Sequence, residues 1–528
     1  MKGTLRLVSL AGILAMTLLP VFAFAEDDHE RGSDRDHPAS QGQWRLAGQN
    51  PGNTRSQPHE HKISKVNVSQ LTPKWFFTTA ASVSATPTVA GDGVYFPDWA
   101  GNIYAVDKNS GQQLWSTKVS DYDGVPGAFS RVSPVVFGDE IIFGDTTGQG
   151  GANLIAVDRA TGVLRWITNI EAHDAAIVTG SPVVFRGVVY QGVSSSEEGG
   201  AISSAYPCCT FRGSVVALNA STGEQIWKTY DMPDNLGATD QYSGGAIWQP
   251  PAIDARRGLL YVGTGNNYTV PAAVEQCQAT DPASTDCTAP DDYFDSTLAL
   301  DLRTGAIKWA RHLQGYDAYT LACLSSVQGI SCPSPAGPDY DLSGSGPNVI
   351  DDFLGIGQKS GIYWSLNPND GSIRWGTPVG PAGTLGGIQW GTATDGKRAY
   401  VAITNNEKTP YTLTSGQTIT WGAWSAVDLD TGEILWQTPD PTEGALDMGA
   451  LSVANGVVYA GSFSGNMYAL DSATCKVLWS FASGGSVLDG PAIADGVVYW
   501  GSGYPKVSGM QNNKVYAFSL PHGRDDQR

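Results

Sequence analysis

Basic residues are scarce in this sequence of 528 residues. It has 32 lysines and arginines against 51 aspartates and glutamates, a formal net charge of −19 at pH 7. Without residues 1–25, which hold two basic and no acidic residues, 30 basic residues would face the same 51 acidic ones, for a charge of −21. Because so acidic a surface repels phosphates, we expect neither nucleic acid nor an anionic membrane as partner. A neutral substrate or a cationic partner protein is favoured.

Two cysteine motifs are missing as well. The sequence has no Cys-x-x-Cys-His, so we expect no covalently attached haem, and no cysteine near the N-terminus that would accept a lipid. Residues 1–25 combine the basic Lys2 and Arg6, an apolar run over 8–22 and small residues before Ala25. This pattern predicts a signal peptide cleaved near Ala25 and a periplasmic or secreted protein without a membrane anchor. An uncleaved anchor is the less favoured alternative.

Tryptophan, in contrast, is plentiful and recurs in a fixed phrase. In residues 105–115 an apolar strand ends in Ala-Val-Asp, a turn closes on Gly111, and Trp115 follows four residues later. The last copy has Cys475 in place of the glycine, where we expect a buried, inert thiol. Self-similarity at intervals of 43 to 82 residues predicts a repeat architecture. The other copies end at Trp166, Trp227, Trp309, Trp375, Trp436 and Trp479.

Each copy predicts one blade of a β-propeller. Residues 86–90, 93–98, 102–107 and 112–119 are strand-forming runs separated by turns, which gives four antiparallel strands. In the turn, the aspartate side chain bonds its own backbone and the glycine takes a positive φ. The tryptophan is expected to fill the wedge between neighbouring blades.

The count closes at eight blades. The last repeat, 497–500 and 514–519, has no tryptophan after it, whereas residues 71–77 form a strand with Trp75 and no repeat before it. We therefore expect this N-terminal strand to complete the last blade, which removes both open sheet edges. The predicted fold is one all-β, eight-bladed propeller over residues 44–521, preceded by a disordered acidic leader over 26–43 and followed by a tail over 522–528.

Functional residues are expected where the repeats are interrupted. Residues 193–213, 266–295 and 314–346 are long insertions between the predicted strands. Six of the seven cysteines lie in them, and in an exported protein their spacing favours disulfides. The candidate pairs are Cys208–Cys209, Cys277–Cys287 and Cys323–Cys332.

Five segments carry a family resemblance. They are 193–198 (VSSSEE), 208–213 (CCTFRG), 245–248 (GAIW), 263–268 (GTGNNY) and 357–361 (GQKSG). In sequence and order they resemble the pyrroloquinoline quinone (PQQ)-dependent alcohol dehydrogenases, especially the polyvinyl alcohol dehydrogenase branch, and the resemblance runs from about Trp44 to Pro521. It implies PQQ and Ca²⁺ as cofactors, with a lanthanide in place of calcium left open.

The resemblance also implies roles for particular residues, although each taken alone has an ordinary structural explanation. A cation and two hydroxyls would bind a cofactor carboxylate, an indole would form the stacking floor, and a second cation would bond the quinone oxygens. The cation is Arg131 and the two hydroxyls are those of Thr179 and Ser194. The stacking indole is Trp248, and the second cation is Lys359. Gln389 and Trp390 would contact the cofactor from the far side, and the Cys208–Cys209 pair would cover it, although it lies in a different blade from the pair of the small-alcohol members.

Metal ligands and the catalytic base follow from the same resemblance. Asn266 and either Glu197 or Glu198 are the implied calcium ligands, with Asp317 as the third. Asp317 is also the expected base, and the reserves are Asp339 and Asp341. The assignment departs from the small-alcohol members, because this chain has Thr320 where they have an acid.

The leading hypothesis is an exported dehydrogenase. It would oxidise a secondary alcohol, a polymeric one included, and pass electrons to a separate acceptor such as a cytochrome c. Two alternatives stay open. One is a PQQ-like propeller that binds no cofactor and serves as an assembly scaffold, and the other is a PQQ oxidoreductase for a sugar, an aldehyde or a bulky hydroxylated natural product.

Overall fold

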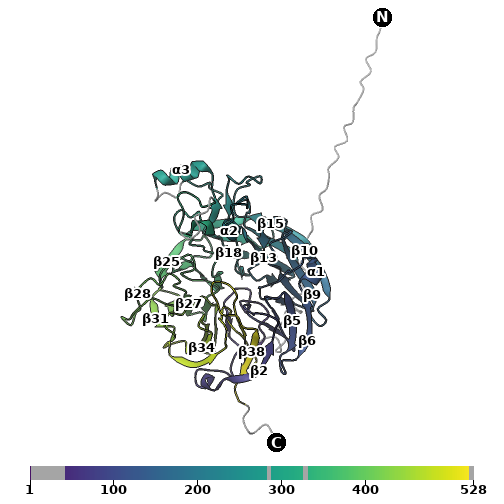
Figure 1. Cartoon of the computed structure of the whole chain (residues 1–528), viewed down its shortest axis with the longest axis vertical. Helices are drawn as coiled ribbons and strands as arrows, with labels where there is room; N and C mark the ends of the chain where they lie inside the picture. The colour runs from purple at the N-terminus through teal and green to yellow at the C-terminus, as the bar shows by residue number, and fades with distance from the viewer. Residues whose placement is uncertain (2–41, 282–286, 325–330, 522–528) are drawn as a thin grey trace. The chain divides into compact units, whose positions relative to one another are not determined.

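The strands form a ring of sheets (Figure 1). The computed structural model describes Met1 and residues 42–281, 287–324 and 331–521. In these residues the strands form eight sheets of four or five strands, antiparallel except for the pair β1–β32, and two two-stranded sheets. The predicted all-β, eight-bladed propeller is therefore confirmed. The expected signal peptide, nearly all of the expected leader and the expected tail lie outside the described residues.

Most blades are meanders of strands in chain order. The first four contain β3 to β6 (Thr88–Ala90, Gly93–Pro97, Asn102–Asp107, Gln113–Lys118), β7 to β10 (Val135–Phe137, Glu140–Gly144, Ala152–Asp158, Leu164–Glu171), β12 to β15 (Val183–Phe185, Val188–Ser195, Ser214–Asn219, Gln225–Tyr230) and β17, β18, β20 and β21 (Ala252–Asp254, Leu259–Gly263, Ser296–Asp301, Ile307–His312). The next three contain β22 to β25 (Asn348–Ile350, Phe353–Gly357, Ile362–Leu366, Ile373–Pro378), β26, β27, β30 and β31 (Ala393–Thr394, Arg398–Ile403, Ala423–Asp428, Ile434–Pro439) and β32 to β35 (Leu451–Ala454, Val457–Gly461, Asn466–Asp471, Val477–Ala482).

The eighth blade joins the two ends of the propeller. Its strands are β36 (Ala492–Ala494), β37 (Val497–Ser502), β38 (Lys514–Ser519) and, antiparallel to β38, β2 (Thr72–Thr78). Trp75 stands opposite Ala517 in this pairing. The expected closure by the N-terminal strand is confirmed.

Short elements decorate the blades. The strands are β1 (Ser56–Gln57), β11 (Ala176–Ile177), β16 (Ser243–Gly244), β19 (Asn267–Thr269), β28 (Tyr411–Thr412) and β29 (Thr418–Ile419). The helices are η3 (Val68–Gln70), α1 (Ser120–Asp123), α2 (Glu197–Gly200), α3 (Ala272–Thr280) and η4 (Leu321–Cys323). Among the described residues, none of these helices has the length and apolar character needed to span a membrane.

A ring of indole hydrogen bonds links the blades. Trp115 Nε1 donates to the Arg159 carbonyl at 3.0 Å, in the turn of the following blade. The pattern continues around the ring until Trp479 donates to Leu71, and Trp75 donates to Lys108, both at 3.0 Å. The intervening bonds run from Trp166 to Ala220, Trp227 to Leu302, Trp309 to Pro368, Trp375 to Leu429 and Trp436 to Ser472.

The turn glycine is required by this packing. Gly111 has φ +70°, and a Cβ there would lie 2.7 Å from the Trp75 ring. Asp107 Oδ1 accepts backbone N–H bonds from Asn109 and Ser110, which holds the turn. Cys475 adopts the same left-handed conformation, with φ 59°, and is a free cysteine whose burial raises its thiol pKa.

The insertions are cross-linked as expected. The structure joins Cys208 to Cys209, Cys277 to Cys287 and Cys323 to Cys332. The second of these disulfides fixes the end of α3, and the third fixes η4. The disulfides thus restrain segments that have few strands of their own.

Candidate active site

One cavity of about 200 Å³, here called the inner cavity, gathers most of the predicted cofactor residues. These residues reach it from loops and strand ends of several blades, so the fold assembles segments that are far apart in sequence. Its lining includes eight of the predicted residues: Arg131, Thr179, Ser194, Glu198, Trp248, Lys359, Gln389 and Trp390. Asp341, a reserve candidate, also lines it.

Arg131 is held in an aromatic cage. Its guanidinium carbon lies 4.4 Å from the Trp390 ring centroid, 5.2 Å from that of Trp99 and 5.6 Å from that of Tyr504. Cation–π contacts of this kind stabilise a charged group without an acidic partner, which leaves the charge available to an anion. Trp99 and Tyr504 were not predicted, because each follows a strand in the position of an ordinary turn residue.

Two indoles form the floor and wall of the cavity. The Trp248 and Trp390 rings lie 5.2 Å apart at an interplanar angle of 67°. The Trp390 backbone N–H donates to the Gly344 carbonyl at 2.7 Å, and the φ of this residue, 60°, is rare for a bulky side chain. Such a backbone conformation persists only where the surroundings fix it, which indicates a precisely oriented ring.

Hydroxyl groups stand opposite. Thr179 Oγ1 and Ser194 Oγ are 2.8 Å apart, and Ser194 also donates to the Ile177 carbonyl at 3.1 Å. Gln389 is buried and donates its amide to the Gly386 carbonyl at 3.0 Å. These side chains are oriented by the protein before any ligand is bound.

Lys359 brings a second positive charge to the inner cavity. Its Nζ lies 2.8 Å from Asp339 Oδ1 and 2.8 Å from Asp341 Oδ2. It is also 5.8 Å from the Trp248 ring centroid. Burial by itself would lower the pKa of Lys359, but the charges of Asp339, Asp341 and Glu198 outweigh it and raise this pKa well above its usual range. Lys359 is therefore charged.

Carboxylates outnumber this cation. Burial raises the pKa of Glu198 to about 7, against the effect of Lys359, and burial raises the pKa of Asp317 to about 6. The pKa of Asp339 is raised well above its usual range, again chiefly by burial. Burial likewise raises the pKa of Asp295, which lies beside Asp317. An excess of buried oxygen ligands is the environment that a hard divalent cation neutralises, so the donor set fits calcium.

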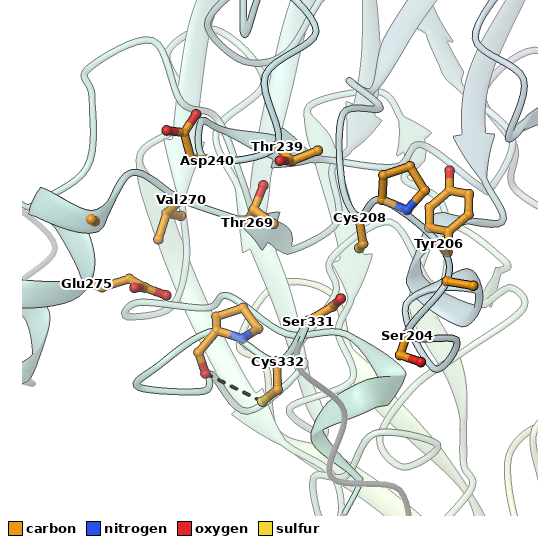
Figure 2. Close-up of a pocket in the computed structure, with 14 residues that line it drawn as sticks. Ser204, Tyr206, Cys208, Thr239, Asp240, Thr269, Val270, Glu275, Ser331 and Cys332 are labelled. Carbon is orange, nitrogen blue, oxygen red and sulfur yellow. Dashed lines mark hydrogen bonds between the residues drawn. The ribbon is translucent and has the colours of Figure 1, made fainter.

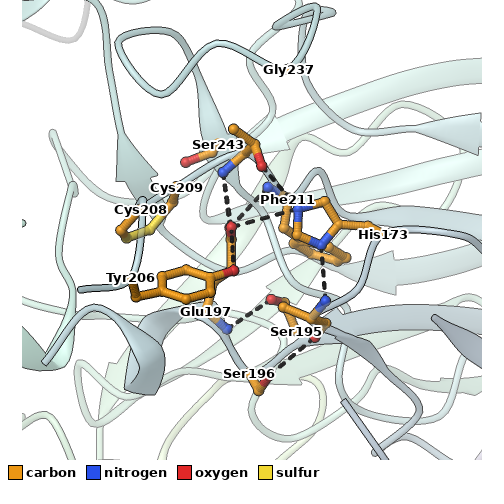
Figure 3. Close-up of polar contacts among 12 residues, drawn as sticks. His173, Ser195, Ser196, Glu197, Tyr206, Cys208, Cys209, Phe211, Gly237 and Ser243 are labelled. Carbon is orange, nitrogen blue, oxygen red and sulfur yellow. Dashed lines mark hydrogen bonds and ion pairs between the residues drawn. A yellow bond between two sulfur atoms is a disulfide. The ribbon is translucent and has the colours of Figure 1, made fainter. Parts of the chain in front are cut away.

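Glu197 and Glu198 point in different directions. Glu197 is buried, and its carboxylate accepts hydrogen bonds from the Tyr206 hydroxyl at 3.0 Å and from the Thr210 and Phe211 N–H groups at 3.0 and 2.8 Å (Figure 3). His173 Nε2 lies 3.5 Å from the same carboxylate. Glu198 instead lines the inner cavity. Of the two, Glu198 is the one placed to meet a ligand.

Asn266 and Asp317 are buried and are not among the residues that line the inner cavity. The Asn266 amide donates to the carbonyls of Asn267 and Tyr319 at 2.9 and 2.8 Å, which leaves its side-chain oxygen as an acceptor, and the Asn266 N–H donates to Asp341 Oδ1 at 2.9 Å. Asp317 accepts N–H bonds from Asp339 at 3.0 Å and Tyr340 at 2.5 Å.

In the part of the chain that the structure describes, no three His, Cys, Asp or Glu side chains form a metal-holding group by themselves. A metal there would need amide or cofactor oxygens in addition. The Cys208–Cys209 pair is also displaced from the expected place, because Cys208 lines a separate, outer cavity and neither cysteine lines the inner one.

Two family profiles match overlapping parts of the chain. A profile described as outer membrane protein assembly factor BamB matches residues 26–207 and 421–525. A profile described as glucose/ethanol/alcohol dehydrogenase, beta-propeller domain, matches residues 178–319. The two matches overlap at 178–207, which contains Thr179, Ser194 and Glu198, whereas Trp248 and Asn266 lie in the dehydrogenase match alone.

Whole-chain relatives agree. Polyvinylalcohol dehydrogenases from Sphingopyxis sp. (strain 113P3) and Pseudomonas sp. are 32% and 30% identical, over 87% and 90% of this chain and 73% and 77% of theirs. The crystal structure of quinohemoprotein alcohol dehydrogenase from Comamonas testosteroni has a TM-score of 0.68 at 19% identity, covering 91% of this chain and 82% of that one. Because the two polyvinylalcohol dehydrogenases match most of this chain at 30% identity or more, the chain belongs to the family of PQQ-dependent alcohol dehydrogenases.

Proposed function

We propose that this chain is an exported, PQQ- and calcium-dependent dehydrogenase that oxidises a secondary or polymeric alcohol to the ketone. Electrons would pass to a separate acceptor such as a cytochrome c. One observation carries the proposal: a guanidinium, an ammonium, two indoles and two carboxylates converge on one cavity of the propeller.

The cavity's residues suit a flat, anionic quinone. Arg131, with the Thr179–Ser194 hydroxyl pair, would bind a cofactor carboxylate through charge-assisted hydrogen bonds. Trp248 would offer a stacking face, and Lys359 would stabilise negative charge on a quinone oxygen. When bound, PQQ and calcium supply the hydride acceptance and the Lewis-acid polarisation that protein side chains lack.

Calcium would be held by the Glu198 carboxylate and the Asn266 amide oxygen, with cofactor oxygens completing the set. Both are hard ligands of the kind that Ca²⁺ prefers. The surplus of carboxylates over Lys359 supports a cation here. Glu197 is not proposed as a ligand, because its oxygens already accept bonds from Tyr206, Thr210 and Phe211.

Proton removal from the alcohol is the step for the chain's own residues. The geometry favours Asp341 over Asp317 as the base, because Asp341 lines the inner cavity and is oriented by Lys359 and the Asn266 N–H. It would accept the hydroxyl proton as the carbinol C–H bond breaks and the C=O bond forms. Asp317, held by two backbone N–H groups, remains the alternative, and Asp339 is paired with Lys359.

The substrate and the acceptor are proposed from the relatives. Two of them are named polyvinylalcohol dehydrogenase, and a third, 25% identical over 85% of this chain, is named lupanine 17-hydroxylase [cytochrome c]. The net charge of −19 supports a cationic electron acceptor, because opposite charges accelerate encounter.

Reconstitution tests the proposal. Purified cofactor-free protein receives PQQ, calcium, both or neither, and reduction of a dye is followed with primary, secondary and polymeric alcohols. We expect turnover only when both are added, and faster with secondary than with primary alcohols. Turnover without PQQ would refute the assignment.

An assembly scaffold is the second candidate, favoured by the BamB-type match over two segments of the chain. A scaffold would bind no PQQ. Titration of intrinsic tryptophan fluorescence with PQQ separates the two functions, because Trp248 and Trp390 line the cavity and a bound quinone would quench them.

A further inference from the structure

A second cavity lies among the insertions. This outer cavity has a volume of about 530 Å³ and is lined by residues from four segments: 204–208, 239–240, 269–275 and 331–333 (Figure 2). It has no lining residue in common with the inner cavity. None of the four segments belongs to a blade strand, so the outer cavity is built by the insertions and not by the repeat.

One short strand separates the two cavities. Tyr268 lines the inner cavity and the next residue, Thr269, lines the outer one. Successive side chains of a strand point to opposite faces, so β19 forms a common wall. The wall is held in place by Asn267, whose N–H donates to the Asp317 carbonyl at 3.1 Å and whose carbonyl accepts from Tyr319 at 2.8 Å.

The lining of the outer cavity is mixed in polarity. Hydroxyl groups come from Ser204, Thr239 and Ser331, and carboxylates from Asp240 and Glu275. Figure 2 places Tyr206 and Cys208 on one side and Glu275 on the other. The remaining walls are apolar, from Pro207, Val270 and Pro333 among others.

This composition selects a class of ligand. No lysine or arginine is among the described residues that line the outer cavity, so it has no group to neutralise an anion. Carboxylates and hydroxyls accept hydrogen bonds from alcohol groups, and the apolar walls suit methylene groups between them. A neutral chain with alternating CH₂ and CHOH groups presents both kinds of surface.

Size points the same way. Ligand cavities usually measure about 300–1,000 Å³, and the inner cavity, at about 200 Å³, is smaller than that range. The outer cavity, at about 530 Å³, lies within it. A substrate longer than a few carbons therefore has more room on the far side of β19 than at the reacting position.

We propose that the outer cavity is a second binding subsite for a neutral, polyhydroxylated chain, which it holds while one carbinol of that chain reacts in the inner cavity. The inference rests on the proposed function and specifies its substrate class. Asp240 and Glu275 accept hydrogen bonds from hydroxyls of the unreacted part of the chain. Within the protein, the Glu275 carboxylate accepts a hydrogen bond from the Ser334 N–H at 3.0 Å.

The test is a comparison of two substrates in three proteins. The variant Asp240→Asn with Glu275→Gln removes both acceptor charges, and Glu224→Gln, an exposed glutamate outside both cavities, is the matched control. With poly(vinyl alcohol), we expect about a tenfold rise in KM at unchanged kcat in the double variant, roughly the loss of one hydrogen bond to a charged group. With a monomeric secondary alcohol, we expect both constants to stay within about twofold of the wild type.

An equal rise in KM for both substrates, or an unchanged KM for the polymer, would overturn the proposed subsite. A binding measurement covers the case in which the protein shows no turnover. Calorimetry with cofactor-free protein and poly(vinyl alcohol) needs no turnover, and a Thr239→Trp variant fills the outer cavity without touching the inner one. We expect wild type and Glu224→Gln to bind the polymer and Thr239→Trp to lose binding.

The activity and binding measurements together distinguish the proposed function from the proposed subsite. If the wild type oxidises neither alcohol but binds the polymer in a way that Thr239→Trp abolishes, the proposed function fails and the subsite stands. If the wild type oxidises the monomeric alcohol but never binds the polymer, the proposed function stands and the subsite is wrong.

Discussion

Glu197 Oε2 accepts a hydrogen bond from the Phe211 N–H at 2.8 Å, two residues beyond the Cys208–Cys209 disulfide. The same carboxylate accepts from the Thr210 N–H. It therefore fixes the backbone that leaves the disulfide, while its neighbour Glu198 lines the inner cavity. Adjacent glutamates in one motif thus have different tasks, one structural and one directed to a ligand.

Glutamine variants of the two residues make a matched pair. Glu197→Gln replaces an acceptor with an amide donor facing the Tyr206 hydroxyl and two N–H groups, so we expect a loss of about 1–3 kcal/mol of stability. Glu198→Gln removes a proposed metal ligand, so we expect an unchanged melting temperature and a 10- to 100-fold weaker response of activity to calcium, roughly the effect of disturbing a metal shell. Thermal melts and calcium titrations measure the two effects. The reverse pattern would assign the ligand to Glu197.

Removing Lys359 should abolish activity. Lys359→Met leaves Asp339 and Asp341 buried without their cation, and loss of a buried partner costs about 3–5 kcal/mol. We expect turnover to fall by about 10²–10³-fold, and Lys359→Arg to recover part of it because the charge is kept. Steady-state dye reduction measures the effect. Lys514→Met, whose ammonium lies 4.8 Å from the Phe76 ring, is the control and should match wild type.

Because a Lys359→Met protein that unfolds would prove little, a second variant is needed. Lys359→Met combined with Asp339→Asn removes one charge of each sign and should restore much of the stability. Activity should stay low in this double variant. Full activity with PQQ and calcium would show that the ammonium is dispensable.

Stability should depend on the pH through Asp145. Burial raises the pKa of this aspartate to about 6, against hydrogen bonds from the Asn153 side chain and N–H. A carboxyl with a raised folded-state pKa favours folding when protonated, so its contribution is complete below about pH 4 and is lost as the pH rises to about 6. A shift of about two units corresponds to about 3 kcal/mol.

Asp145→Asn removes that titration. Denaturation at pH 4 and pH 7 should therefore show a smaller loss of stability on raising the pH in the variant than in wild type. Asp139→Asn, at a side chain 89% exposed, is the control. Equal pH dependence in wild type and Asp145→Asn would contradict the shifted pKa.

Two glycines test the tryptophan ring. Gly432 and Gly416 have similar φ values, +76° and +85°, but a Cβ at Gly432 would lie 2.6 Å from the Trp375 ring whereas nothing lies within 4 Å at Gly416. Alanine at either position costs about 1–2 kcal/mol for the left-handed backbone. We expect Gly432→Ala to cost about 1–3 kcal/mol more, from overpacking. Thermal unfolding measures the difference. Equal melting temperatures would show that the Trp375 side chain moves aside without cost.

The propeller was predictable because each blade repeats the same physical solution. Trp115 and its counterparts occupy equivalent positions, so one copy interprets the others. Trp75 without a repeat before it, and Ala517 without a tryptophan after it, were enough to predict that β2 pairs with β38. Strand ends were less certain, since the turn aspartates and glycines mark the turns and not the last hydrogen bond.

The candidate site was predictable in composition but not in detail. Motifs brought Arg131, Trp248 and Lys359 to one place, because loops at one end of a propeller must meet. The choice between Glu197 and Glu198 depended on hydrogen bonds to Thr210 and Phe211, which sequence cannot reveal. The outer cavity was also beyond prediction, because insertions have no repeat to constrain them.

Pairing β2 with β38 has a consequence for how the protein is made. A chain emerging from the ribosome holds β2 from early on, but β38 is synthesised hundreds of residues later. Until then, Leu71 and Trp75 lack their neighbours from the C-terminal part of the chain, and two strands at the gap in the ring have backbone groups without hydrogen-bond partners. Such a delay before final folding would suit the export proposed above, because a chain crosses a membrane before it becomes compact.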